Sequence, residues 1–291
     1  MRLPFQVPPA GSRPFDVVGL GLNSLDLVAV VAEYPRPNSK QRLQRFSRQP
    51  GGQIATALAA CARLGWTARY VGRFGDDEHG DLVRESLQRA GVDVSASRVV
   101  AGANNQFAVV IVDARSGERT VLWDRHPGLS MDPAEVPRDA VTCGRMLIVD
   151  CHETAAATAA ARYARDAGVP TVIDVEKVRS GIFDLLRQID AIIAAQDFPS
   201  ALTGEQDPGR ALAVLARETG AALVCTTLGS EGSLALCGGR EIRTPGFPVD
   251  CVDSTGAGDV FRGAFVAACL REPDGDVEDA LRYANAAAAL N

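Results

Sequence analysis

Four short apolar runs in the second half of the chain limit the possible folds most strongly. Each run is three or four residues long, and helical stretches such as 154–167 and 208–219 separate them. Runs that are apolar on both faces are typical of parallel strands covered by helices on each side. Their alternation with helices predicts βαβ units and a doubly wound sheet. The runs are Met146–Val149, Thr171–Ile173, Ala191–Ile193 and Ala222–Cys225.

Two further segments interrupt this alternation and predict a small additional sheet. Each consists of two strand-like stretches joined by a turn, Pro35–Asn38 in the first and Asp113–Gly117 in the second. A small sheet inserted into an α/β chain could cover a substrate or pair two subunits. We expect one domain over residues 1–291, with lid strands within about 27–50 and 104–126. The stretches are Leu27–Val31, Leu43–Ser47, Phe107–Val112 and Thr120–Trp123.

Composition and charge exclude several classes of protein. The chain has 291 residues, 46% of them hydrophobic and 23% charged, which fits a globular protein with a sizeable core. Its net charge of −6 argues against nucleic acid as a partner. No apolar run approaches the roughly 20 residues that a membrane span needs. The proline-rich start, Met1–Arg13, has no apolar signal core, so we expect a cytoplasmic protein.

Common metal and cofactor motifs are missing from the sequence. The seven cysteines form no Cys-x-x-Cys pair, and the three histidines lie far apart, so reduced buried cysteines are expected rather than a zinc site. Gly19-x-Gly21 lacks the third glycine of a dinucleotide fingerprint, and no P-loop motif occurs. His152-Glu153 is not followed by a second histidine at helical spacing, which excludes a zincin motif.

The segment Asp253–Asp259 carries the clearest chemical signal. Its glycines allow backbone N–H groups to turn inward before a helix, an arrangement that holds anions. Gly256, Ala257 and Gly258 would face a phosphoryl group, while Asp259 would orient an acceptor hydroxyl and take its proton. The helix start is expected to lower the pKa of Asp259. The alternative interpretation is that Asp259 only caps the helix.

The same segment also carries a family resemblance. Residues Asp253–Phe265 resemble the C-terminal signature of the ribokinase-like (PfkB) carbohydrate kinases. The resemblance extends over nearly the whole chain, and four further segments resemble other motifs of this family. They are Gly19–Asp26, Gly51–Gly65, Gly72–Gly80 and Thr227–Gly232.

The resemblance implies a three-layer α/β/α fold with a mostly parallel central sheet and a small β-sheet lid. It also implies ATP, Mg²⁺ and, in many members, a monovalent cation such as K⁺. Asp26, Gly51 and Gly52 would bind the sugar. The strand-end loop with Thr227, Gly229 and Gly232 would lie along the nucleotide phosphates. Asp253 and the carbonyl of Thr255 would hold the monovalent cation.

The chain departs from the family pattern at several positions. Thr56 stands where the N-terminal signature has asparagine, so a different sugar contact is expected. The Asn-x-x-Glu element that organises Mg²⁺ falls at Ala195–Phe198, where both functional positions are apolar, leaving Asp197 or other groups to place the metal. These two departures resemble the branch containing sulfofructose kinases, in which Lys40 would match a substrate-anion contact. Relatives also continue past the final alanine-rich run, Asn285–Asn291.

The sequence thus predicts an ATP-dependent kinase acting on a hydroxyl of a ribose- or fructose-like sugar. Trp123 is a further candidate for substrate contact from the lid. Two alternatives stay open: a nucleoside kinase of the same fold, and a sugar-binding regulator without turnover. A homodimer through the lid is expected, because pairing two lids would protect the exposed strand edges.

Overall fold

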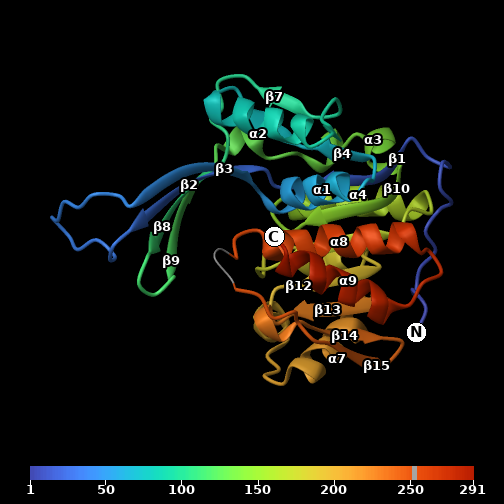
Figure 1. Cartoon of the computed structure of the whole chain (residues 1–291). Coiled ribbons are helices and arrows are strands. Elements are labelled where there is room, and N and C mark those ends of the chain that lie inside the picture. Colours follow the sequence, from blue (N-terminus) through green and yellow to red (C-terminus); the bar gives the residue numbers. More distant parts are fainter. Residues whose placement is uncertain (251–253) are drawn as a thin grey trace.

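We describe a computed structural model of the chain, which defines residues 1–250 and 254–291. A large, mostly parallel sheet forms the body, with antiparallel strands at one edge only (Figure 1). From that edge, its strands are β15 (Arg240–Thr244), β14 (Ser233–Cys237), β13 (Leu223–Thr227), β12 (Ala191–Ala194), β11 (Thr171–Val175), β10 (Gly144–Asp150), β1 (Phe15–Leu20), β4 (Ala68–Val71) and β6 (Val92–Asp93).

Helices bury both faces of this sheet, as its apolar strands require. Along β10, Met146 and Ile148 join the core beneath one helix layer, while Leu147 and Val149 join the core beneath the other. The first layer contains α1 (Gln53–Arg63), α2 (Glu78–Arg89), α8 (Ala257–Arg271) and α9 (Val277–Ala289). The second contains α3 (Arg138–Thr142), α4 (Thr154–Asp166), α5 (Ile182–Leu186), α6 (Phe198–Thr203) and α7 (Pro208–Thr219). The predicted three-layer fold is therefore confirmed.

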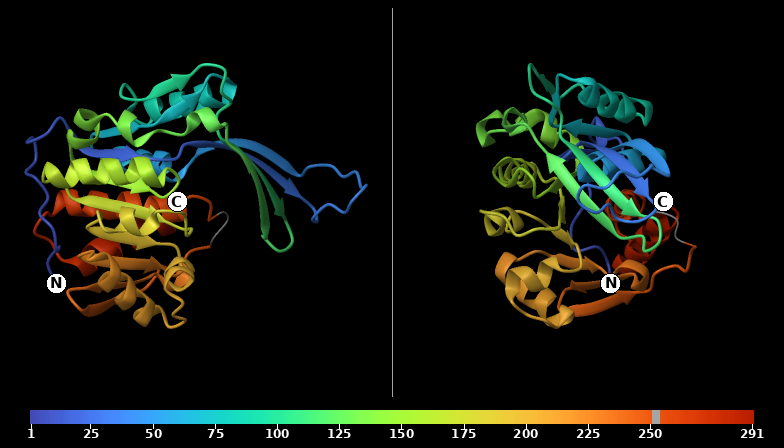
Figure 2. Two further views of the ribbon diagram at one scale, coloured as in Figure 1. Left: turned by 180° about the vertical axis from the view of Figure 1, so that it is seen from behind. Right: turned by 90° about the vertical axis from the view of Figure 1, so that its left-hand side faces the viewer.

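A second sheet projects from the body as a lid (Figures 1 and 2). Its order is β3 (Arg45–Gly51), β2 (Ser24–Val31), β8 (Phe107–Asp113) and β9 (Arg119–Asp124), with β2 and β8 parallel. Strand β2 starts earlier than predicted, and β3 starts later and continues to Gly51. A two-stranded pair of β5 (Arg73–Gly75) and β7 (Arg98–Val100) lies outside both sheets.

Candidate active site

A cavity of about 540 Å³ lies where the lid joins the body. The end of β3, the start of α1, the start of α8 and the C-terminal part of α9 contribute to its wall. The fold thus brings together residues that are more than 200 positions apart in the sequence. Seven residues singled out in the sequence line this cavity: Asp26, Gly51, Gly52, Thr56, Thr255, Gly256 and Asp259.

The lid end of the cavity is built around Asp26 on β2. Ser24 Oγ donates a hydrogen bond to Asp26 Oδ1 at 3.2 Å, and burial raises the pKa of Asp26. A Cβ on Gly51 would lie 3.2 Å from Asp26 Oδ2. Gly52, which caps α1, has φ of 99°, and a Cβ there would lie 2.5 Å from the Asn23 Cα. Only glycine therefore lets α1 begin this close to the Asp26 strand.

The body end of the cavity is the first turn of α8. Gly256 precedes the helix in the left-handed region with φ of 79°. The Ala257 N–H donates to the Ser254 carbonyl at 3.2 Å, so one of the three predicted anion-binding N–H groups is already engaged. Gly258 and Asp259 lie in the first turn, where N–H groups have no intrahelical acceptor. No side-chain cap is formed, so Asp259 does not cap the helix.

The expected lowering of the Asp259 pKa is wrong. The structure raises the pKa of Asp259 well above its ordinary value, because the half-buried side chain is desolvated and faces the negative charge of Asp174. The positive charge of Arg262 only partly offsets these effects. Desolvation and a neighbouring like charge outweigh the partial charge of a helix terminus.

Two buried aspartates at neighbouring strand ends do not line the cavity, but their charges act on Asp259, and both were missed in the sequence. Asp150 ends β10 and pairs in register with Asp174 on β11. The backbone N–H groups of Leu22 and His152 donate to Asp150 at 2.6 and 2.9 Å, yet burial still raises its pKa to about 6. Asp174 faces the buried Arg262 of α8. The available signal was an aspartate directly after each of the first two apolar runs, Met146–Val149 and Thr171–Ile173.

The predicted nucleotide loop follows β13 at the same edge of the sheet. Thr227 ends the strand, and a short 3₁₀ turn, η3 (Gly229–Glu231), follows it. The Leu228 N–H donates to the Gly232 carbonyl at 2.8 Å and closes the loop. Gly232 has φ of 95°, and a Cβ there would lie 2.1 Å from the Thr244 carbonyl oxygen. Thr227, Gly229 and Gly232 do not line the cavity that holds Asp26 and Asp259.

Two other candidate substrate contacts lie on the lid, away from the cavity wall. Lys40 is exposed in the loop between β2 and β3. Trp123 lies on β9 with 62% of its surface exposed. Neither residue lines the cavity in this conformation. Their predicted roles would therefore require movement of the lid or a second molecule.

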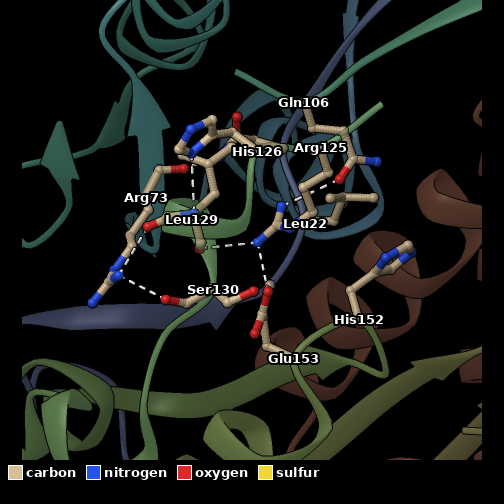
Figure 3. A network of polar contacts seen from close by, with 12 residues as sticks. Leu22, Arg73, Gln106, Arg125, His126, Leu129, Ser130, His152 and Glu153 are labelled. Atoms are coloured by element: carbon tan, nitrogen blue, oxygen red, sulfur yellow. Dashed lines mark hydrogen bonds and ion pairs between the residues drawn. The ribbon is translucent and has the colours of Figure 1, made fainter. Parts of the chain in front are cut away.

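A polar network fastens the lid to the body (Figure 3). Arg125, directly after β9, donates to Glu153 Oε1 at 2.6 Å and to the Leu129 carbonyl at 3.0 Å. Its other nitrogen donates to Gln106 Oε1 at 3.2 Å. Arg125 and Glu153 have 17% and 18% of their side-chain surfaces exposed. This half-buried ion pair links the end of a lid strand to the start of α4.

The described residues offer no preformed metal cage. Over residues 1–250 and 254–291, no group of three or more His, Cys, Asp or Glu side chains is arranged to hold a metal. Asp197 is exposed at the start of α6. The Thr255 carbonyl accepts a hydrogen bond from Asn291 at 2.8 Å, and the predicted partner Asp253 lies outside the described residues. In the same part of the chain, every helix is too short or too polar to cross a membrane.

The layered fold and the glycine turn beside a carboxyl define the class of small-molecule kinases with a β lid. The family model for pfkB family carbohydrate kinases matches residues 15–291, and the chain belongs to this family. Similar proteins include an ATP-dependent ribose-1-phosphate kinase of Halopiger xanaduensis, 30% identical over 94% of this chain and 90% of that protein. Fructokinase-2 of Oryza sativa subsp. japonica is 27% identical over 97% of this chain and 89% of its own length.

A solved structure shows the same architecture. Arabidopsis thaliana ribokinase, in complex with ribose and ATP, superposes with a TM-score of 0.81 and 26% identity, covering 95% of this chain and 92% of that chain. Together with the family match, these similarities confirm the predicted class of ATP-dependent sugar kinases. The roles of individual residues stay predictions.

Proposed function

We propose that this carbohydrate kinase transfers the γ-phosphoryl group of ATP to a hydroxyl of a ribose- or fructose-like sugar or sugar derivative. The observation that carries the proposal is the shared cavity of Asp26 and Asp259, with glycine turns beside each carboxyl. Asp26 would hold sugar hydroxyls at the lid end. Gly256 and the N–H groups of the first turn of α8 would face the phosphoryl group at the body end.

The chemistry assigned to the body end is proton removal combined with charge stabilisation. The acceptor oxygen attacks the γ-phosphorus, a new P–O bond forms, and the P–O bond to the ADP oxygen breaks. The hydroxyl proton passes to Asp259. Free N–H groups at the helix start, such as that of Gly258, stabilise the negative charge on the phosphoryl oxygens.

The nucleotide would lie along the loop after β13, with Thr227, Gly229 and Gly232 beside its phosphates. ATP arrives with Mg²⁺, which neutralises phosphate charge when bound. The described side chains do not form a dedicated cage, so phosphate oxygens and water would supply most of the Mg²⁺ ligands. A monovalent cation at the Thr255 carbonyl is a further proposal. Replacing K⁺ by tetramethylammonium at constant ionic strength should lower kcat, and unchanged kcat would argue against this cation.

A metal-dependent ATP consumption assay tests the proposed reaction. The panel contains ribose, fructose, sulfofructose, ribose-1-phosphate and nucleosides. Asp259→Asn should leave folding intact and lower kcat by two or more orders of magnitude, roughly the contribution of a general base. Asp26→Asn should mainly raise KM for the sugar. Arg187→Gln, which changes an exposed ion pair on the opposite helix layer, is the matched control.

Three outcomes separate the candidate functions. Turnover of a sugar that Asp259→Asn abolishes supports the proposal. Turnover restricted to nucleosides would identify a nucleoside kinase instead. Tight sugar binding without turnover of any compound would indicate a binding protein. An Asp259→Asn variant that keeps most of its activity would remove Asp259 from the mechanism.

We also propose that the protein forms a homodimer through its lid. The lid sheet has few buried apolar side chains of its own, and large apolar side chains on it are exposed. Phe46 on β3 is 53% exposed, and Leu122 and Trp123 on β9 are 57% and 62% exposed. A partner lid would cover such side chains. Light scattering should give twice the monomer mass for wild type, and Leu122→Asp should shift it toward monomer.

We propose the cytoplasm as the place of action. The six described cysteines are all unpaired and most are buried, which suits a reducing compartment. Cell fractionation checks this location, and recovery only in a secreted fraction would contradict it.

A further inference from the structure

Helix α8 carries a buried arginine within an otherwise apolar stretch. Arg262 follows Asp259 by three residues, so the two side chains lie on the same side of the helix. Its Nε lies 3.1 Å from Asp174 Oδ1, and the two side chains are only 5% and 2% exposed. Its Nη2 donates to the Ile193 carbonyl at 3.4 Å. Arginine is rarely buried this fully unless it is paired.

Besides Arg262, Asp174 also faces Asp259. Asp259 lies one helical turn before Arg262 on the same side of α8, so the arginine that contacts Asp174 also brings the Asp259 carboxyl near it. Two ionised carboxylates beside one buried arginine would leave a negative charge unpaired, and a proton on one of the two carboxyls removes that charge. Within the described part of the chain, no well-aligned N–H group donates to either oxygen of Asp174, although Arg262 Nε is close. A proton held between the two carboxyls would give Asp174 the hydrogen-bond partner that it lacks.

We propose that Asp174 and Arg262 are positioning residues that hold one shared proton between Asp174 and Asp259 in the free enzyme. Arg262 balances the one negative charge that remains on the pair. Asp259 then becomes available as a base only after the shared proton has left to solvent. This inference rests on the proposed kinase function. It adds that Asp174 and Arg262 control the protonation of Asp259 at the body end of the cavity.

The surrounding charges agree with this arrangement. Burial and the charge of Asp174 raise the pKa of Asp259, while Arg262 lowers it. Asp150 at the end of β10 and Glu176 after β11 also raise it. The Cys225 thiol on β13 faces Arg262 but stays neutral, because burial raises its pKa to about 12. Asp150 in turn faces Arg125 and Glu153.

The proton balance links this pair to the reaction. The transfer step delivers the hydroxyl proton to Asp259 as the new P–O bond forms and the bond to ADP breaks. If Asp259 already carries the shared proton, it cannot accept another. The rate constant kcat/KM should therefore fall at acidic pH with an apparent pKa that belongs to the pair, above that of an isolated aspartate.

The test compares the acid limb of kcat/KM in opposing variants. Asp174→Asn removes the like charge and offers an N–H donor to Asp259. The acid limb should therefore move to lower pH by about one unit or more. Arg262→Met removes the cation, so the acid limb should move to higher pH by about as much. Arg262→Lys keeps the charge and should stay near wild type. Purely structural damage would lower activity at every pH without moving the limb.

A double variant covers the case in which Arg262→Met fails to fold. Asp174→Asn with Arg262→Met removes both buried charges, and its acid limb should lie between those of the single variants. Limbs that coincide in Asp174→Asn, Arg262→Met and wild type would overturn the inference while leaving the kinase function standing.

An infrared difference spectrum gives a readout that needs no substrate. At neutral pH, wild type should show the C=O band of a buried carboxylic acid that is missing in Asp259→Asn. Asp174→Asn should weaken the same band, because Asp259 then ionises more readily. Absence of the band from wild type would overturn the shared proton. If the band behaves as expected but no substrate is turned over, the proposed function fails and the shared proton stands.

Discussion

The two sheets of this protein bury their residues very differently. Every residue of β10, β11 and β12 in the body sheet is buried, with helices on both sides. In the lid, the only buried apolar cluster consists of Val28, Ala108 and Val110. The Asp259 end of the site is therefore held by a tightly packed sheet, whereas the Asp26 end belongs to a sheet with little core of its own. We therefore expect the Asp259 carboxyl to keep its position and the Asp26 carboxyl to shift with the lid.

The largest expected effect comes from the same substitution made in each sheet. Ile192→Ala on β12 empties a fully buried position and should lower the free energy of unfolding by about 2–5 kcal/mol. Ile111→Ala on β8 removes the same atoms from a half-buried position and should cost less than about 1.5 kcal/mol. Denaturant titration at constant pH measures both. Equal losses would show that the lid is as tightly packed as the body.

The body could be predicted from sequence because its strands carry a strong signal. An apolar run buried on both faces is continuous, and the predicted runs match strands β10 to β13. The lid signal is weaker because one face is exposed. The stretch Arg45–Gly51 contains Phe46 as its only large apolar residue, so its bounds were misplaced by several residues.

The site was predictable only where a motif marks it. The glycines around Asp26 and Asp259 signal tight turns, and these residues line one cavity. Asp174 and Arg262 lie 88 positions apart in the sequence, and only the strand order brings them together. The pKa of Asp259 depends on that neighbour and on burial, which local sequence does not encode. The helix-terminus argument therefore gave the wrong sign.

Breaking the attachment between lid and body should have an intermediate effect. Arg125→Met leaves the half-buried Glu153 without its partner and should cost about 1–3 kcal/mol. Glu153→Gln keeps a hydrogen-bond acceptor for Arg125 and should cost less. The double variant completes a cycle that isolates the pair. Hydrogen exchange should report faster opening of β8 and β9 than of β11 in Arg125→Met. Uniform acceleration across both sheets would mean that the lid does not open separately.

The smallest expected effect concerns pH dependence where the body sheet meets the lid. Burial raises the pKa of Asp150 to about 6, against about 3.9 in the unfolded chain. Its contribution to the free energy of unfolding is full below about pH 4 and is lost as pH rises through about 6. Burial lowers the pKa of His152 to about 4, against about 6.5 unfolded. Its contribution is full above about pH 6.5 and is lost as pH falls through about 4.

These two contributions oppose each other over the same pH range, so single variants should separate them. When the pH is lowered from 7 to 5, the free energy of unfolding of Asp150→Asn should fall relative to wild type, and that of His152→Gln should rise. Each change should be on the order of 1–2 kcal/mol. Carboxyls whose pKa is lowered, such as Asp16 and Asp93, titrate below this range and do not interfere. Urea unfolding at both pH values measures the slopes. If the free energy of unfolding changed with pH in the same direction in both variants, relative to wild type, Asp150 and His152 would not have the opposite pKa shifts of buried groups. The strand ends beneath the lid would then be exposed to water, as much of the lid is.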